Sequence, residues 1–436
     1  MRTIYIECGT TNRNPVNSGI QRVVRNIVRE AQYISANMGV MCIPVEYVHE
    51  RFQVLEEKNH NHSTTSRQTN FLFSIIIRLD QFAQQSYFSS TYYRFRHIIK
   101  SVVRKKISIK KKNTPSEPIF DNTEEQSNSP SKRYASSPIL LLLDSSWIPG
   151  MWSEVEKFRA AGGHVTAVLY DLIPFSHPDT VAEATRIAHT TWWSKAPLHV
   201  DSVICISQSV REEFLAWQET QKLPRKLAPE RVGYFYLGAD IAKNDPVLVL
   251  ITDSIPFYLV VGSLEPRKNH ALVLDAFEQL WQRGHEIRLV IVGAFGWKSE
   301  RLLERIYAHP ELNKRLYLIR DASDRDLATL YSKTAGVIIP SIAEGFGLPI
   351  VEAFQHGTSV ICSDIPVFRE VAGVDAVYFD PYDSNSLVKV LSSSSIPGDD
   401  QYIVKNSAKK CWLSWQESAE SLLSCVNTMA TGDSKK

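Results

Sequence analysis

The chain has 436 residues, of which 44% are hydrophobic, so it is long enough for two domains with buried cores and is not largely disordered. No apolar run approaches the ~20 residues that a transmembrane helix needs, and the first residues lack the apolar core of a secretory signal. Both absences predict a cytoplasmic protein. The net charge is +2, yet nine Lys and Arg and no acid fall within residues 81–116, so a basic segment interrupts a mildly acidic chain.

The first elements expected are a strand at Thr3–Glu7 and a polar loop from Gly9 to Asn17. A helix should follow, because apolar residues recur at helical spacing from Ile20 to Ala31. Ser18 and Gln21 have the spacing of a capping box at its start.

Strands and helices then alternate through the rest of the first half. The expected strands are Ile139–Asp144, Val165–Tyr170 and Ser202–Ile206, with helices near Trp152–Ala160, near Val181–Trp193 and from Ser207. Such alternation is typical of a parallel sheet with helices on both faces.

Residues 52–137 interrupt this alternation. The stretch Asn113–Arg133 is rich in Ser, Pro, Asn and charge, which predicts a mobile loop. Before it, Phe88–Val102 has the apolar spacing of an amphipathic helix with basic residues between. This helix either packs on the domain or contacts an anionic membrane surface through Arg94–Lys112.

A second series of strands and helices begins near Pro256. Its expected strands are Phe257–Gly262, Ile287–Gly293, Arg315–Ile319, Gly336–Pro340, Thr358–Cys362 and Ala376–Phe379, with helices from Asn269, around Glu300–Tyr307 and through Ser323–Tyr331. Two doubly wound halves in series predict a ligand in the cleft between them, beyond the carboxyl ends of the strands.

The most informative motif is PSIAEGFGLPIVEA at residues 340–353, which follows an apolar strand and opens a helix. Gly345 and Gly347 allow the backbone to approach a ligand closely, and the amino end of the helix favours an anion such as a phosphate. Glu344 and Glu352, eight residues apart, can both address that ligand, since carboxylates accept hydrogen bonds from sugar hydroxyls.

This motif resembles the E-x7-E motif of the retaining glycosyltransferases of family 4, which adopt the GT-B fold. The resemblance covers residues 257–380 strongly and residues 1–30 and 164–240 more loosely. It implies an α/β protein with two Rossmann-like, doubly wound domains facing a cleft. It also implies that Glu344 contacts hydroxyls of the donor sugar and that Glu352 accepts hydrogen bonds from the nucleotide ribose.

The resemblance predicts three parts of the chain. Residues 1–245 would form an acceptor-side domain that includes the insertion at 52–137, and residues 246–408 would bind the nucleotide sugar. Residues 409–430 would form a helix that crosses back to the first domain.

A second motif, VGSLEPRKN at residues 261–269, resembles the family's glycine, arginine and lysine loop. The resemblance implies that Gly262 borders the donor and that Arg267 and Lys268 lie over the leaving diphosphate. Two fixed cations stabilise the negative charge that develops there, so no metal ion is required. No cluster of metal ligands is visible either, and the six cysteines contain no CxxC pair.

The remaining donor contacts also follow from the resemblance. Backbone N–H groups of Phe346, Gly347 and Leu348 would reach the sugar and the diphosphate, and Gly345 would border the donor beside them. Gly19 matches the glycine loop that faces the donor phosphates from the first domain, whereas Arg22 either adds charge there or faces solvent.

The family often has a histidine at the position of Tyr170, so a donor contact from that position is not predicted here. Asp171, at the end of a strand, is the candidate for binding the acceptor hydroxyl, and His177 is either a substitute for the family's histidine or structural. Ser207 is either a family contact or a helix cap. The nucleotide base would lie near Arg320 and Asp321.

The sequence therefore predicts an enzyme that transfers a hexose, with retention, to a hydroxyl of a glycan or lipid-linked glycan. Mannose from GDP-mannose is the first guess for the donor. The setting would be surface polysaccharide synthesis at the inner face of the cytoplasmic membrane. Three alternatives stay open: a nucleotide-sugar epimerase or phosphorylase on the same fold, a catalytically inactive sugar-binding protein, and a nucleic-acid binder. The last lacks any recognisable nucleic-acid motif, so no nucleic-acid partner is expected.

Overall fold

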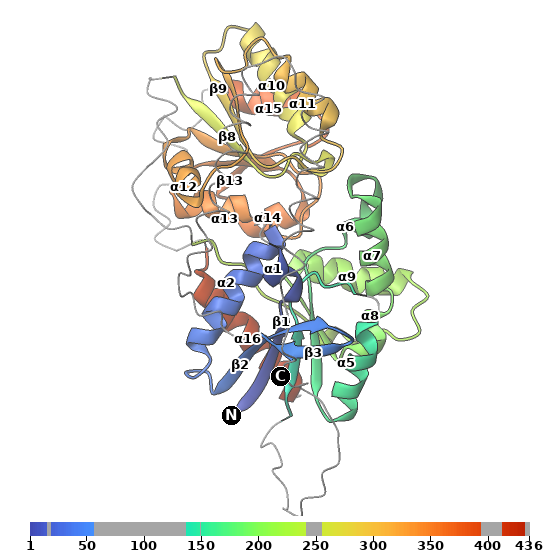
Figure 1. Cartoon of the computed structure of the whole chain (residues 1–436). Coiled ribbons are helices and arrows are strands. Elements are labelled where there is room, and N and C mark those ends of the chain that lie inside the picture. Colours follow the sequence, from blue (N-terminus) through green and yellow to red (C-terminus); the bar gives the residue numbers. More distant parts are fainter. Residues whose placement is uncertain (15–18, 56–136, 149, 241–254, 394–411, 432–436) are drawn as a thin grey trace, which may run out of the picture. The chain divides into compact units, whose positions relative to one another are not determined.

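The computed structural model describes residues 1–14, 19–55, 137–148, 150–240, 255–393 and 412–431 (Figure 1). The two sheets described below belong to one compact unit, residues 1–52 with 120–436. We call the seven-stranded sheet with its helices the first lobe and the six-stranded sheet with its helices the second lobe. The predicted basic helix at Phe88–Val102, its membrane contact through Arg94–Lys112, the loop at Asn113–Arg133 and the cap at Ser18 lie outside the described residues.

The first sheet has seven strands in the order β3-β2-β1-β4-β5-β6-β7. The strands are β1 (Arg2–Glu7), β2 (Val40–Val48), β3 (Arg51–Val54), β4 (Ile139–Leu142), β5 (His164–Leu169), β6 (Ser202–Cys205) and β7 (Val232–Tyr234). Neighbours from β2 to β7 pair in parallel. Its helices are α1 (Gly9–Arg13), α2 (Gly19–Ile34), α5 (Met151–Ala160), α6 (Ile173–Ser176), α7 (Glu183–Trp193), α8 (Ala196–His199) and α9 (Gln208–Thr220).

The polar loop predicted from Gly9 to Asn17 is wrong at its start, because Gly9–Arg13 form the short helix α1. Two carboxylates beside it account for this helix: Glu7 accepts a hydrogen bond from the N–H of Gly9 at 2.9 Å, and Asp144 accepts one from the N–H of Thr11 at 2.5 Å. Carboxylates at the amino end of a helix satisfy N–H groups that have no partner within it.

Strands β2 and β3 were not expected from the sequence. Pro44 interrupts β2, and buried residues alternate clearly only in its second half. A pattern broken in this way is weak evidence for a strand.

The second sheet has six strands in the order β10-β9-β8-β11-β12-β13, and their pairing is parallel. The strands are β8 (Phe257–Val261), β9 (Arg288–Val292), β10 (Leu316–Ile319), β11 (Gly336–Ile339), β12 (Val360–Ser363) and β13 (Ala376–Phe379). Its helices are α10 (His270–Gln282), α11 (Glu300–Tyr307), α12 (Asp324–Lys333), α13 (Leu348–Gln355), α14 (Pro366–Ala372) and α15 (Ser384–Ser392).

Apolar clusters cover both faces of the second sheet, one around Phe277 of α10 and the other around Tyr331 of α12 and Phe368 of α14. Strands buried on both faces need continuous apolar sequences, and every residue of β9 is buried. This is the doubly wound arrangement that the alternation predicts.

The last helix, α16 (Trp415–Thr431), follows the second sheet in sequence but packs against α2, β6 and β7 (Figure 1). The backbone N–H of Trp415 donates to the Asp240 carboxylate at 2.9 Å, and the hydroxyl of Ser418 donates to the carbonyl of Tyr236 at 2.7 Å. No helix of the described part is long and apolar enough to cross a membrane. The domain limits at 245 and 408 stay a prediction.

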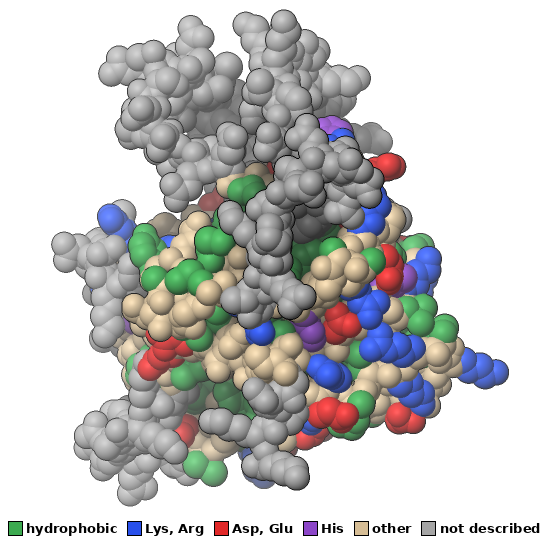
Figure 2. All heavy atoms as spheres, turned by 90° about the horizontal axis from the view of Figure 1, so that it is seen from below, with side chains coloured by type: hydrophobic (Ala, Val, Ile, Leu, Met, Phe, Trp, Pro, Cys, Tyr) green, Lys and Arg blue, Asp and Glu red, His purple; other side chains and the backbone are tan. Residues whose placement is uncertain are grey.

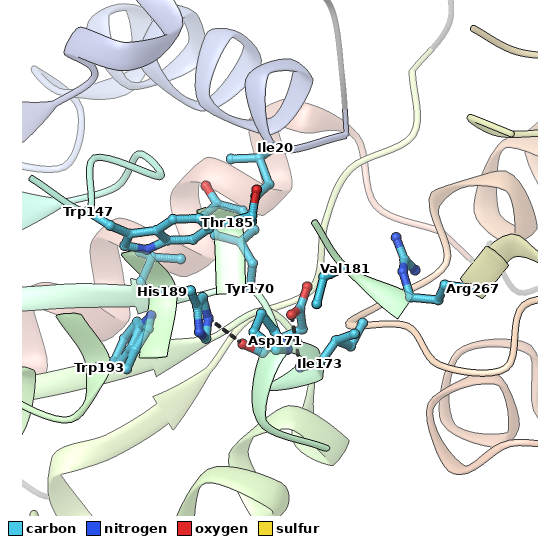
Figure 3. A pocket seen from close by; sticks show the side chains of 12 residues that line it. Ile20, Trp147, Tyr170, Asp171, Ile173, Val181, Thr185, His189, Trp193 and Arg267 are labelled. Atoms are coloured by element: carbon cyan, nitrogen blue, oxygen red, sulfur yellow. Dashed lines mark hydrogen bonds between the residues drawn. The ribbon is translucent and has the colours of Figure 1, made fainter. Parts of the chain in front are cut away.

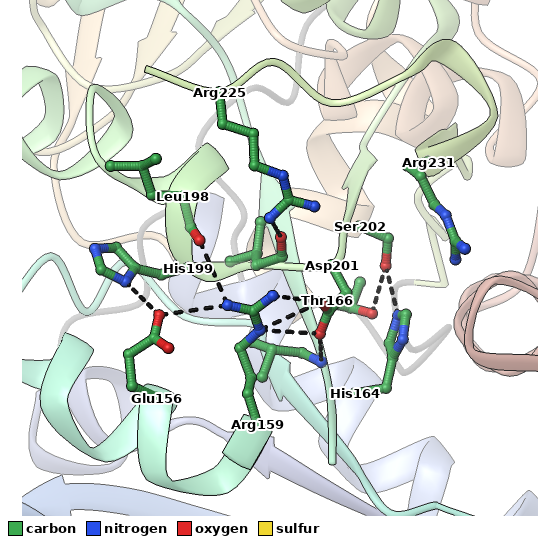
Figure 4. Close-up of polar contacts among 12 residues, drawn as sticks. Glu156, Arg159, His164, Thr166, Leu198, His199, Asp201, Ser202, Arg225 and Arg231 are labelled. Carbon is green, nitrogen blue, oxygen red and sulfur yellow. Dashed lines mark hydrogen bonds and ion pairs between the residues drawn. The ribbon is translucent and has the colours of Figure 1, made fainter. Parts of the chain in front are cut away.

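A polar network lies where β5 and β6 begin (Figure 4). Arg159 of α5 pairs with Asp201 at 2.9 Å, and Asp201 accepts the N–H of Val165 at 2.9 Å. These contacts tie a helix to the amino edge of the first sheet. On the face seen in Figure 2, the described basic and acidic side chains are interspersed rather than separated by sign.

The strand order changes direction between β1 and β4 in the first sheet and between β8 and β11 in the second. In open parallel sheets, ligands bind beyond the carboxyl ends of the strands at such switch points. Both informative motifs lie there, because the loop of Gly262 follows β8 and the loop of Glu344 follows β11.

Candidate functional site

Glu344 joins the two motifs of the second sheet. Its Oε2 lies 2.8 Å from Nη1 of Arg267, and its Oε1 accepts hydrogen bonds from Nζ of Lys268 and, at 2.8 Å, from the hydroxyl of Ser341. Arg267 also donates to the carbonyl of Ala343 at 2.9 Å. The structure thus brings together an acid and two cations that sequence reasoning assigned to a common site.

The two cations control the ionisation of Glu344. Burial alone would raise the pKa of this carboxyl group, but attraction to Arg267 and Lys268, with hydrogen bonds from Lys268 and Ser341, lowers the pKa to about 2. Glu344 is therefore a carboxylate at every physiological pH. A carboxylate whose oxygens are both paired with cations is a strong hydrogen-bond acceptor and a weak nucleophile.

The turn after Glu344 requires glycine. Gly347 has a φ of +102° at the position before α13, a left-handed conformation that side chains disfavour. A Cβ on Gly345 would lie 2.0 Å from the carbonyl oxygen of Tyr170. The N–H groups of Phe346, Gly347 and Leu348 belong to the start of α13, where no intrahelical acceptor exists. This turn can present them to an anion.

Contacts with residues near β5 and β6 hold the same turn. Ser207 donates its hydroxyl to the carbonyl of Gly345 at 2.8 Å and accepts the N–H of Val210 at 3.1 Å. Ser207 is therefore both the cap of α9 and a contact to the motif of the second sheet.

Glu352 has a separate set of partners. It lies inside α13, is 2% exposed, and pairs through Oε1 with Nη1 of Arg22 at 2.6 Å. The hydroxyl of Tyr331 donates to its other oxygen at 2.7 Å. Arg22 does not face solvent, since only 16% of its side chain is exposed.

Asp171 lies beside a cavity of about 120 Å³ beyond the end of β5 (Figure 3). Burial is the main cause of a raised pKa at Asp171, and nearby Arg267 opposes it. The wall is mostly apolar and aromatic and is formed by Ile20, Trp147, Val168, Tyr170, Ile173, Pro174, Val181, Thr185, His189 and Trp193 together with Asp171 and Arg267.

His189 of α7 holds the backbone at Asp171 in place. Its Nε2 lies 3.1 Å from the carbonyl oxygen of Asp171, and its ring packs edge-to-face with Trp147 at 4.9 Å between centroids. Burial lowers the pKa of His189 to about 4, so the ring is neutral at pH 7 and Nε2–H donates this bond.

The polar atoms of Tyr170 and His177 both have partners close by. The Tyr170 hydroxyl donates to the carbonyl of Leu143 at 2.7 Å, so its polar end bonds within the first sheet. The Nδ1 atom of His177 lies 3.0 Å from the hydroxyl of its neighbour Ser176. His177 is not among the residues that line the cavity.

The other predicted donor residues occupy the ends of strands or the start of a helix. Gly19 begins α2, and a Cβ there would meet no atom within 4 Å. Gly262 directly follows β8, and a Cβ there would lie 3.6 Å from Cδ of Lys268. The guanidinium of Arg320, just after β10, lies 3.8 Å from the centre of the Phe295 ring.

Sequence reasoning missed Ser341, Tyr331 and His189. Only Ser341 had a local signal, since it lies three residues before Glu344 in the motif. The others join the site through partners far away in the sequence. In the described ranges, no three His, Cys, Asp or Glu side chains are grouped so that they could hold a metal ion.

Comparison with protein families finds that residues 248–409 match the family described as "Glycosyl transferases group 1". The chain is 34% identical over 323 residues to the serotype-specific mannosyltransferase WbdA of Escherichia coli, which covers 70% of the chain and 40% of the relative. It is also 26% identical to the O-antigen chain mannosyltransferase RfbU of Salmonella typhimurium, over 51% of the chain and 58% of the relative. The chain thus spans about 40% of the length of the WbdA relatives.

Two solved structures resemble the whole chain. Sucrose-phosphate synthase from Thermosynechococcus elongatus aligns with a TM-score of 0.58 and 14% identity over 99% of this chain and 100% of that one. Anabaena HepE in complex with UDP-glucose aligns with a TM-score of 0.52 and 14% identity over 99% and 98%. At this identity the likeness concerns the fold alone, and it confirms the predicted GT-B fold of two parallel α/β sheets.

Proposed function

Because residues 248–409 match the family described as glycosyl transferases group 1, we propose that the chain transfers a hexose from a nucleotide diphosphate sugar to a hydroxyl of a glycan, with retention at the anomeric carbon. The observation that carries the proposal is the contact of Glu344 with Arg267 and Lys268 at the switch point of the second sheet. Mannose is the proposed sugar, because the relatives WbdA and RfbU are named mannosyltransferases. The proposed setting is surface polysaccharide synthesis.

The donor would be held mainly by the second sheet. Arg267 and Lys268 would exchange part of their contact with Glu344 for the diphosphate, and the amino end of α13 would add N–H donors. Glu344 would then accept hydrogen bonds from the sugar hydroxyls. Once the donor is bound, both cations would contact the diphosphate, so the charge that develops as it leaves would be stabilised without further reorganisation.

The acceptor would enter the cavity next to Asp171. Aromatic and apolar walls suit the carbon face of a sugar ring, and the Asp171 carboxylate suits a hydroxyl group. The leaving diphosphate would take the proton of that hydroxyl on the same face of the donor. The low pKa and double pairing of Glu344 favour this route over a covalent intermediate on Glu344.

A panel of GDP-, UDP- and ADP-sugars with an α-mannoside acceptor tests the proposal, with EDTA present because the two cations are proposed to act without a metal. We expect acceptor-dependent nucleotide release from GDP-mannose and a product with α configuration. Glu344→Gln should lower kcat by about 10²–10³-fold, as loss of a transition-state contact does. Glu304→Gln, on an exposed part of α11, is the matched control.

Two results would contradict this function. Conversion of a donor in the absence of acceptor would favour the epimerase alternative. An unchanged transfer rate in Glu344→Gln would show that the reaction does not depend on this carboxylate, and would remove the observation on which the proposal rests.

A further inference from the structure

The pair formed by Arg22 and Glu352 joins elements from the two sheets. Arg22 lies in the first turn of α2, which covers the first sheet, and Glu352 lies in α13, which follows β11 of the second. Their charged atoms are 2.6 Å apart, and both side chains are largely buried. The pKa of Arg22 is raised chiefly by Glu352, against burial, with smaller contributions from Asp324 and Tyr331.

Each oxygen of Glu352 has one fixed donor. Arg22 holds Oε1, and the buried hydroxyl of Tyr331 holds Oε2 at 2.7 Å. Tyr331 is itself fixed, because its ring stacks on His356 at 5.5 Å between centroids with 3° between the planes. The carboxylate therefore has a single orientation, set by two groups that do not neighbour it in sequence.

A carboxylate oxygen can accept two hydrogen bonds, so one donor on each oxygen leaves capacity for two hydroxyl groups. The Arg22–Glu352 pair would add little to folding stability alone, since a buried ion pair is often no more stabilising than apolar residues of similar volume. Two adjacent acceptors with fixed directions are instead what a vicinal diol, such as the 2′- and 3′-hydroxyls of a ribose, requires.

We propose that Arg22 is a positioning residue for the donor nucleotide, which orients the Glu352 carboxylate from the other lobe so that it accepts hydrogen bonds from the ribose hydroxyls. This inference rests on the proposed function, in which Glu352 contacts the ribose. It assigns to the first lobe a part in recognising a nucleoside that the second lobe would bind.

The test compares nucleotides with and without the ribose hydroxyls. Dissociation constants of GDP and of 2′,3′-dideoxy-GDP are measured by calorimetry for the full chain, with UDP and 2′,3′-dideoxy-UDP in parallel. For the wild type we expect a preference of about tenfold or more for the native nucleotide, because hydrogen bonds to a buried carboxylate are lost in the analogue. Arg22→Gln should reduce this preference below about threefold, and Arg22→Lys should restore part of it.

Arg29→Gln is the matched control, because Arg29 lies on the same helix, is 56% exposed and pairs with Glu30. It should keep the full preference. In transfer assays, Arg22→Gln should raise the donor KM while changing kcat little. If Arg22→Gln does not fold, Tyr331→Phe supplies the same measurement from the other oxygen of Glu352.

The variant Glu352→Gln separates the positioning role of Arg22 from the ribose contact of Glu352. If it loses the preference while a folded Arg22→Gln keeps it, the inference on Arg22 is overturned and the donor role of Glu352 stands. If Glu352→Gln keeps the preference as well, the ribose contact itself is wrong, and the inference fails with it. Transfer activity in the donor panel is measured separately, so the proposed function can stand or fail whatever the nucleotide binding shows.

Discussion

Two largely buried glutamates that follow or end strands have pKa values shifted in opposite directions. Glu344 has a pKa of about 2 because Arg267 and Lys268 outweigh its burial. Glu7, which is 1% exposed at the end of β1, has a pKa raised to about 7, first by burial and then by the nearby Asp144. Burial acts in the same direction at both residues, so the sign of the neighbouring charge decides the outcome.

This contrast predicts a pH dependence of stability that comes from Glu7. Between pH 4.5 and about 7 the folded state keeps a proton that the unfolded state has released, so stability falls as pH rises through this window. The loss would be roughly 3 kcal/mol by pH 8, at about 1.4 kcal/mol per pKa unit. Glu7→Gln, which mimics the protonated acid, should flatten the fall.

Melting temperatures at pH 5 and pH 8 measure this effect. We expect Glu7→Gln to melt higher than the wild type at pH 8, with a smaller difference at pH 5. Glu30→Gln, on α2, should follow the wild type at both values. Equal pH dependence in Glu7→Gln and wild type would show that Glu7 is ionised in the folded state.

At the scale of elements, helix α9 starts with help from another helix. Glu370 of α14 accepts the N–H groups of Gln208 and Ser209, each at 2.7 Å, and also the Ser209 hydroxyl. Ser207, the residue directly before α9, supplies the usual side-chain cap by accepting the N–H of Val210. A carboxylate at a helix amino end satisfies free N–H groups and interacts favourably with the helix dipole.

Removal of this carboxylate should therefore destabilise the contact between α9 and α14. We expect Glu370→Ala to cost about 1–2 kcal/mol, as the loss of a helix cap does, and to lower the melting temperature. Glu212→Ala, one turn further along α9, should cost less than about 0.5 kcal/mol, as exposed substitutions do. Equal melting temperatures for the two variants would show that the cap from α14 is dispensable.

At the scale of the whole described molecule, helix α16 returns the chain from the second sheet to the first. Trp415 is 1% exposed, and the backbone beside it leaves no room for a Cβ on Gly238, which would lie 2.6 Å from the Trp415 nitrogen. The carbonyl of Met429, near the other end of α16, accepts a hydrogen bond from Arg231 at 2.8 Å. Both ends of this helix are thus attached to the first lobe.

Trp415→Ala should destabilise the protein by about 3–5 kcal/mol, because truncation of a buried tryptophan leaves a cavity. Thermal melting measures the effect, and Tyr382→Ala, 75% exposed, is the control that should leave the melting temperature nearly unchanged. If Trp415→Ala melts like that control, α16 does not contribute to the stability of the first lobe.

Local sequence rules determined the fold class and predicted the two motifs of the candidate site. Apolar periodicity identified alternating strands and helices, and the motifs around Gly262 and Glu344 were recognisable because their residues are neighbours in sequence. The strand β2 escaped these rules because Pro44 breaks its pattern.

Only the tertiary structure decided which residues that are distant in sequence contact one another. Arg22 with Glu352, Glu370 with α9, and the aromatic wall next to Asp171 each combine residues from distant parts of the chain. Neither spacing nor composition specifies such contacts, because they depend on how strands order themselves in a sheet and which strand ends then meet. The same is true of ionisation. Glu7 and Glu344 are the same residue type in the sequence, and only their surroundings in the folded protein give their carboxyl groups different pKa values.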